Sequence, residues 1–156
     1  MSSRRYVPHV DMLLRSLRIT KERLNSKSKI AIDTELLREI LGLAVGGLPF
    51  SAKFYTGTYA DIADAHSSGE ITDLRRHMTE TGYYEGRMGS PPLVDEAFYV
   101  SRYPDVGAAI ESGAIANATE HYIRAGAAEG RIPRPALQDE INHWNRILLD
   151  GRAAAA

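Results

Sequence analysis

Cysteine is absent from this sequence of 156 residues, which excludes a disulfide framework, a thiolate zinc site and a cysteine nucleophile. Net charge is almost absent as well, because 19 lysines and arginines face 20 aspartates and glutamates. The chain as a whole is therefore no polycation that would seek nucleic acid or an acidic membrane. The longest apolar stretch, in residues 40–50, is interrupted by glycines and a proline and is too short to span a bilayer. With no recognisable secretory signal, a cytoplasmic protein of about one domain is expected.

Persistent alternation of β-branched and polar residues is also missing, so the sequence gives little sign of strands. Apolar residues recur at helical spacing outside the centre of the chain. They predict one amphipathic helix over residues 8–25, a second from a cap at Asp33 or Thr34 to a stop at Gly46 and Gly47, and a last over residues 137–149. We therefore predict an all-α fold, a small helical bundle.

The centre of the chain contains an internal repeat. The segment 54–87, FYTGTYADIADAHSSGEITDLRRHMTETGYYEGR, aligns without a gap with 98–131, FYVSRYPDVGAAIESGAIANATEHYIRAGAAEGR, at an offset of 44 positions. The matches fall on glycines, aromatic residues and a terminal Glu-Gly-Arg, which indicates a tandem duplication. The predicted organisation is N-terminal helices in 1–49, repeat 1 in 50–92, repeat 2 in 93–135, and a C-terminal capping helix with a tail in 136–156.

Each repeat is predicted to form three short helices. In the second copy Asp95 can cap the first helix and Pro104 suits the first turn of the next. Gly113 is a left-handed stop, and Asn117 with Glu120 has the spacing of a capping box. The third helix is expected to end at Gly126, and the corresponding signals of the first copy are Ser51, Gly69, Asp73 and Gly82.

The second copy, FYVSRYPDV followed by SG and by EHYIRAGAAEGR, resembles a short helical tandem repeat of bacterial proteins. That repeat occurs alone, in tandem, and attached to glycosyltransferases and other proteins associated with surface polysaccharides or secretion. The first copy departs from the pattern, since Ala60 replaces the central proline and Met78 the tyrosine of the His-Tyr pair. The resemblance covers about half of the chain. It implies a helical repeat module, a bacterial origin and no agreed catalytic residues.

Two pairs of matched polar residues could carry chemistry. His77 and His121, with Glu85 and Glu129, could supply nitrogen and oxygen ligands to a metal ion. We favour a structural role for both histidines, each packing on tyrosine and bonding a backbone carbonyl, because positions kept in both copies are those that each copy needs to fold. No cofactor and no metal site are predicted.

The arginines of the two Glu-Gly-Arg endings, Arg87 and Arg131, could grip a phosphate or a carboxylate ligand. The alternative that we favour is that each bonds helix-end carbonyls or pairs with Asp61 or Asp105 of its own repeat. The residues to which we assign a structural role in the repeats are Tyr59, Asp61, His77, Glu85, Arg87, Tyr103, Asp105, His121, Glu129 and Arg131.

The tyrosines could form a stacking surface for sugars or bases, but four of them recur at matched positions and are interpreted as core. Tyr83 and Tyr84 have no aromatic counterparts and are the expected exposed pair. The N-terminal helix carries a surplus apolar face flanked by arginines, which predicts a partner or dimer contact. The candidate interaction residues are Leu13, Leu14, Arg15, Leu17, Arg18, Tyr83 and Tyr84.

Three function classes remain open. The first is a non-catalytic helical-repeat module for protein–protein interaction or scaffolding, which serves as an accessory to a bacterial surface-polysaccharide or envelope system and can form homo-oligomers through the N-terminal helix. The second is a nucleic-acid-binding protein that uses residues 1–30, where eight basic side chains face two acidic ones. The third is a metal-binding protein or enzyme built on His77 and His121. The first class is the prediction.

Overall fold

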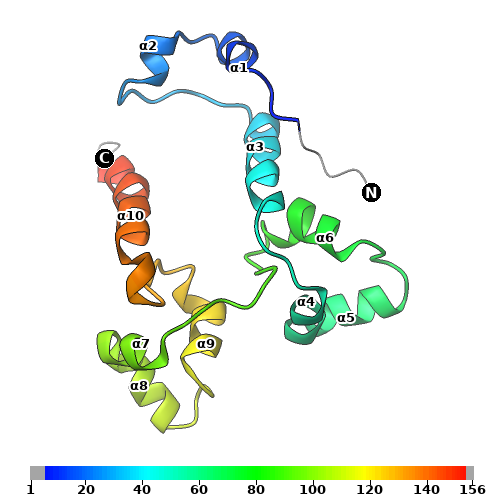
Figure 1. The fold of residues 1–156 in the computed structure, drawn as a ribbon, viewed down its shortest axis with the longest axis vertical. Helices are drawn as coiled ribbons and strands as arrows, with labels where there is room; N and C mark the ends of the chain where they lie inside the picture. The colour runs from blue at the N-terminus through cyan, green and yellow to red at the C-terminus, as the bar shows by residue number, and fades with distance from the viewer. Residues whose placement is uncertain (1–5, 154–156) are drawn as a thin grey trace. The chain divides into compact units, whose positions relative to one another are not determined.

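The computed structural model describes residues 6–153, and the regular elements of that range are all helices (Figure 1). The prediction of a small all-α bundle is therefore confirmed. None of the helices in the described range is long and apolar enough to cross a membrane. The chain divides into two compact units, with unit 1 ending at Gly89 and unit 2 beginning at Ser90.

Unit 1 begins with two short helices, α1 (Val10–Leu17) and α2 (Lys21–Leu24), so the prediction of one continuous helix over residues 8–25 is wrong. Arg18 takes a left-handed conformation with φ 53° after α1. The Arg18 and Ile19 amides donate to the carbonyls of Arg15 and Leu14, which is the hydrogen-bond pattern of a Schellman stop. The hydroxyl of Thr20 then caps α2 by accepting from the Arg23 amide at 3.2 Å.

The rest of unit 1 consists of α3 (Thr34–Gly46), α4 (Ala52–Thr58), α5 (Ala60–Ser67), α6 (Leu74–His77) and the π-helical turn η1 (Met78–Gly82). The end of α3 agrees with the predicted stop at Gly46 and Gly47. Ser51 caps α4 through the Phe54 amide, and Asp73 caps α6 through the Arg76 amide, as predicted.

Unit 2 contains α7 (Glu96–Arg102), α8 (Pro104–Glu111), α9 (Ala118–His121), the π-helical turn η2 (Tyr122–Gly126), the 3-10 turn η3 (Pro135–Leu137) and α10 (Gln138–Ala153). Asp95 caps α7 and Asn117 caps α9, both as predicted. The Glu120 carboxylate accepts from the amide of Ala116, so it reaches one residue beyond the cap. Helix α10 continues beyond the predicted end at residue 149.

The four glycines of the repeats that were predicted to end helices do so in two different ways. Gly69 and Gly113 are left-handed stops, with φ of 81° and 74°. Gly82 and Gly126 are the last residues of η1 and η2, as predicted, and the left-handed turn comes four residues later in each unit, at Gly86 and at position 130. The reason for Gly82 and Gly126 is space, because a Cβ at either would collide with a tyrosine hydroxyl.

Each unit has its own small core. Tyr55 of unit 1 and Tyr99 of unit 2 are completely buried at the centre of these cores. The buried neighbours in unit 1 are Val45, Ile62, Leu74 and Met78, and those in unit 2 are Val106 and Ala118. Seven pairs of positions in these clusters and their margins lie 44 residues apart: Phe50 and Val94, Tyr55 and Tyr99, Tyr59 and Tyr103, Ile62 and Val106, Ile71 and Ile115, Leu74 and Ala118, and Met78 and Tyr122.

Candidate functional site

A tyrosine, a histidine and a glycine meet inside each unit. In unit 2 the Tyr99 hydroxyl lies 3.0 Å from Nδ1 of His121, and a Cβ at Gly126 would occupy the place of that hydroxyl. In unit 1 the Tyr55 hydroxyl lies 3.0 Å from Nδ1 of His77. Helix α4 or α7 supplies the tyrosine, and the histidine ends α6 or α9, so this contact joins the first helix of each segment to its third.

The contact between tyrosine and histidine is a hydrogen bond that holds two helices of the unit together. Burial raises the pKa of Tyr99 to about 12, so the hydroxyl keeps its proton and can donate to the imidazole. Burial has the same effect on Tyr55. The predicted partner of each histidine, a backbone carbonyl, is thus replaced by a tyrosine hydroxyl. Nδ1 of each ring is engaged in this way. The described residues hold no group of three histidine or carboxylate side chains suited to a metal ion.

The arginine of each Glu-Gly-Arg ending closes its own unit. Arg131 pairs with both carboxylate oxygens of Asp105, at 3.0 and 2.9 Å, and its Nε donates to Glu129 at 2.5 Å. The guanidinium lies 4.8 Å from the centre of the Tyr103 ring. Of the two interpretations, the structure has the pairing of the arginine with the aspartate of its own repeat. The hydrogen bonds to the arginine lower the pKa of Asp105 below its usual value.

Unit 1 has the same arrangement. Arg87 donates to both oxygens of Asp61, at 2.9 and 2.7 Å, and to Glu85 at 2.8 Å. Its guanidinium lies 4.9 Å from the centre of the Tyr59 ring. The hydroxyl of Tyr59 accepts from the amide of Met88 at 2.8 Å. The equivalent tyrosine of unit 2 accepts from the amide of residue 132 at 2.8 Å. These arginines are only 18 and 19% exposed and their forks are occupied, so neither is placed to grip a ligand.

The candidate interaction residues of α1 do not form one free face. Leu14 is buried at 7% exposure, which corrects its assignment to a partner contact. In the Schellman stop the amide of half-buried Ile19 donates to the Leu14 carbonyl. Leu13 and Leu17 are half-buried, while Arg15 and Arg18 are exposed.

The predicted exposed tyrosine pair is also corrected in part. Tyr83 is 39% exposed. Tyr84 is half-buried against α3, where its hydroxyl donates to the carbonyl of Arg38 at 2.9 Å. The Arg38 guanidinium lies 3.8 Å from the centre of the Tyr84 ring. A tyrosine with no counterpart in the other copy therefore attaches the flanking helix α3 to unit 1, which sequence comparison within the repeat could not reveal.

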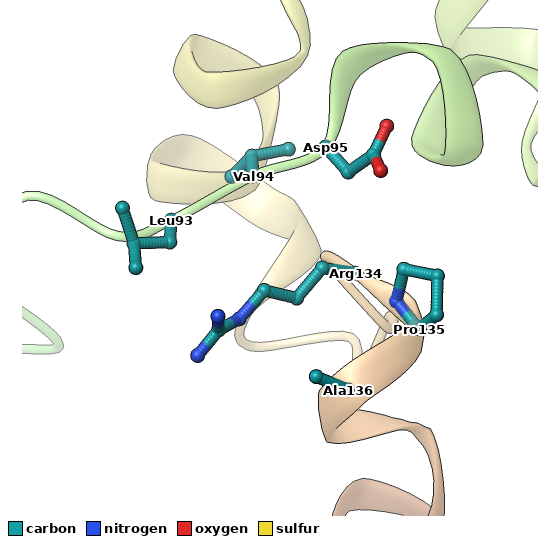
Figure 2. Close-up of a pocket in the computed structure, with 6 residues that line it drawn as sticks. All are labelled: Leu93, Val94, Asp95, Arg134, Pro135 and Ala136. Atoms are coloured by element: carbon teal, nitrogen blue, oxygen red, sulfur yellow. The ribbon is translucent and has the colours of Figure 1, made fainter.

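A groove in unit 2 was not anticipated from the sequence. It has a volume of about 480 Å³ and is lined by Leu93, Val94, Asp95, Arg134, Pro135 and Ala136 (Figure 2). Two short segments form it, one leading into α7 and the other into α10. They are joined by a hydrogen bond from the Asp95 amide to the Pro133 carbonyl at 2.9 Å. The side chain of Arg134 extends along the groove toward Leu93.

Arg134 differs from the paired arginines of the repeats. It is half-buried, and the described residues give it no ion pair and no hydrogen bond from its side chain. Its Nε is completely buried without a hydrogen-bond partner, a condition found at no other side-chain nitrogen or oxygen of the described residues. Arg134 lies just after the aligned segment 98–131, and the position 44 residues earlier is Ser90, so no arginine matches it in unit 1.

Comparison with known protein families, with curated proteins and with solved structures gives no match. The contacts of the chain's own residues are therefore the basis of any assignment.

Exposed apolar side chains lie almost entirely outside the two aligned segments, 54–87 and 98–131. Among the described residues, Tyr83 is the one large exposed apolar side chain within them. The others are Tyr6, Val7, Val10, Met12, Leu24, Ile30, Leu37, Ile40, Leu48, Leu93, Trp144, Ile147 and Leu148. The two aligned segments therefore bury nearly all of their large apolar side chains, and the exposed apolar surface lies on the segments that flank them.

Proposed function

We propose that this protein is a non-catalytic, helical-repeat module for protein–protein interaction. The observation that carries the proposal is the division just described: the matched polar residues bond one another within each unit, while the apolar surface lies on segments outside the duplication. Catalytic or ligand-binding polar groups would instead be expected to converge on a shared pocket.

Helix α10 offers the best-defined contact surface. Trp144, Ile147 and Leu148 are 53, 52 and 61% exposed, and their spacing of three and four residues places them on one face of the helix. Next to this face, α10 contacts the end of the second aligned segment, where the Asn145 amide donates to the Gly130 carbonyl at 3.1 Å. A large exposed tryptophan with aliphatic neighbours is typical of the centre of a protein interface.

The resemblance of the second copy to repeats attached to polysaccharide-associated and secretion-associated proteins supports a more specific proposal. In this proposal, the partner belongs to a bacterial surface-polysaccharide or envelope system, in which the module is an accessory. The basic residues Arg15 and Arg18 are exposed and can contribute a second, weaker contact to the same partner.

Affinity capture from an extract of the source cells tests the proposal. Three baits are compared: the native chain, the double variant Trp144→Ser with Leu148→Ser, and Tyr83→Ser. The Tyr83→Ser variant is the matched control because it also removes a large exposed side chain, but from within a repeated segment. We expect a partner that the native chain and the control retain and the double variant loses. Identical captured proteins for all three baits would contradict the proposal.

A further inference from the structure

Two charged residues, Arg134 and Asp95, and four apolar ones line the groove of unit 2. Leu93, Val94, Pro135 and Ala136 provide the apolar walls (Figure 2). Leu93 is 69% exposed, so the wall that it forms is accessible from solvent. A groove of about 480 Å³ lies within the range of about 300 to 1,000 Å³ that is usual for ligand sites.

One nitrogen of the Arg134 guanidinium, Nε, has no hydrogen-bond partner among the described residues. Arg134 is half-buried and its Nε has lost contact with water without gaining an acceptor. Burial of a charged donor costs free energy unless a partner compensates it. Arg131 and Arg124, in the same unit, have such partners in Asp105 and Glu120. A carboxylate that contacts the terminal nitrogens of Arg134 would compensate the charge of the guanidinium.

The acidic residue of the groove does not serve as that partner. The carboxylate of Asp95 accepts from the amide of Phe98 at 3.0 Å and so caps α7. In Figure 2 it points toward α7, whereas the guanidinium of Arg134 extends the other way, toward Leu93. The two side chains form no ion pair. The positive charge of Arg134 is thus left for a group from outside the unit.

Internal comparison within the chain also points to a ligand. The residues that each repeat needs for folding recur at an offset of 44, as Tyr99 repeats Tyr55. Arg134 corresponds to Ser90, although both units close with the same backbone hydrogen bond, Asp95 to Pro133 and Ser51 to Gly89. The fold of a unit therefore does not require an arginine at this position.

We propose that this groove binds an extended, acidic segment of a protein partner, with a glutamate or aspartate carboxylate on the Arg134 guanidinium and an adjacent aliphatic side chain against Leu93 and Pro135. The guanidinium fork suits a carboxylate, and the apolar walls favour a segment that alternates acidic and aliphatic residues over a free inorganic anion. This inference rests on the proposed interaction function and specifies the chemistry of the partner.

Nuclear magnetic resonance titration of the full chain, labelled with ¹⁵N, tests the inference. The probes are acetyl-Leu-Glu-Leu-amide, its glutamine counterpart acetyl-Leu-Gln-Leu-amide, and inorganic phosphate. We expect the glutamate peptide to shift the Arg134 Nε–H signal and the backbone amides of Leu93, Val94 and Ala136. The glutamine peptide should bind at least tenfold more weakly.

The variants are Arg134→Gln, Arg134→Lys and the matched control Arg102→Gln, which removes an exposed arginine of the same unit. The affinity for the glutamate peptide should fall at least tenfold in Arg134→Gln. It should fall less in Arg134→Lys, because lysine keeps the charge, and stay unchanged in Arg102→Gln. The inference would be overturned if both peptides bound equally or if no probe shifted any signal. It would also be overturned if the shifts were scattered over all arginines, or if phosphate bound more tightly than the glutamate peptide. If Arg134→Gln does not fold, the comparison of the two peptides on the native chain decides.

The capture experiment separates the two proposals. A partner lost by the Trp144 and Leu148 double variant but retained by Arg134→Gln would leave the interaction function standing and refute the groove assignment. A partner retained by both variants would remove the basis of the interaction function itself.

Discussion

The close approach of Gly82 to the Tyr55 hydroxyl gives the sharpest prediction of stability. A Cβ at Gly82 would overlap the Tyr55 hydroxyl and crowd the Met78 sulfur at 3.3 Å. The Tyr55 ring is completely buried and its hydroxyl is held by His77, so it cannot move aside freely. Overpacking of this kind costs about 1–3 kcal/mol. Replacement of glycine by alanine gives back about 0.4–1 kcal/mol through the unfolded state.

We therefore expect Gly82→Ala to lower the free energy of unfolding by about 1–2 kcal/mol, which is a shift of the urea midpoint of about 0.5–1 M for a slope of about 2 kcal/mol per M. The matched control is Gly57→Ala in α4, where an added Cβ meets nothing within 4 Å. The control should be neutral or slightly more stable. Far-ultraviolet circular dichroism during urea unfolding measures both.

The Tyr55→Phe background tests the cause of the Gly82 effect. Removal of the hydroxyl alone should cost about 1 kcal/mol, because a hydrogen bond to His77 is lost. In that background the alanine methyl at Gly82 takes up the vacated volume, so its penalty should fall below about 0.5 kcal/mol. A penalty that is the same in both backgrounds, or equal effects of Gly82→Ala and Gly57→Ala, would refute the reasoning.

Three further predictions concern unit 2, where thermal or urea unfolding can be followed by the fluorescence of the chain's single tryptophan. Arg131→Ala should lower the free energy of unfolding by about 1 kcal/mol, because the contact with Tyr103 is lost. The control Arg102→Ala should change it by less than about 0.5 kcal/mol, and equal effects of the two variants would argue against a structural role of Arg131. The pKa of Asp105 is lowered in the folded chain, so this carboxylate stabilises the fold above its unfolded pKa near 3.8, and the stabilisation is lost as the pH falls below that value. The variant Asp105→Asn should therefore lose less stability on acidification than the native chain. The pKa of Tyr99 is raised from 10.0 to about 12, so stability should decline as pH rises between these values, and a Tyr99→Phe variant that declines as steeply would contradict the assignment.

Local signals in the sequence predicted the helical framework well. Asp73, Asp95 and Asn117 each accept a hydrogen bond from an amide three residues ahead, and this contact depends only on neighbours in the chain. The left-handed turns at Gly69 and Gly113 are equally local. The break between α1 and α2 was missed because the apolar spacing continues through it, while the stop depends on a left-handed arginine that has no strong sequence signal.

Contacts between distant residues were predicted less well. The sequence predicted that helices end at Gly82 and Gly126, as they do, but it did not reveal the tyrosine hydroxyl beside each, which only the folded chain brings there. The predicted hydrogen-bond partner of His77, a backbone carbonyl, was likewise wrong, because Nδ1 of the ring contacts the Tyr55 hydroxyl. Arg134 carried no motif at all. The signal that could have revealed it was its departure from the repeat, since a serine stands at position 90.

The two units thereby act as controls for each other. A contact present in both, such as the pairing of Arg87 with Asp61 and of Arg131 with Asp105, needs no ligand to explain it, because each unit closes its own fold with it. A polar group that only one unit has, and that lacks a partner where it lies, is not explained by folding. Arg134 meets both conditions among the described residues. The fold of the unit does not account for this arginine, and the proposed acidic segment would give its guanidinium a partner.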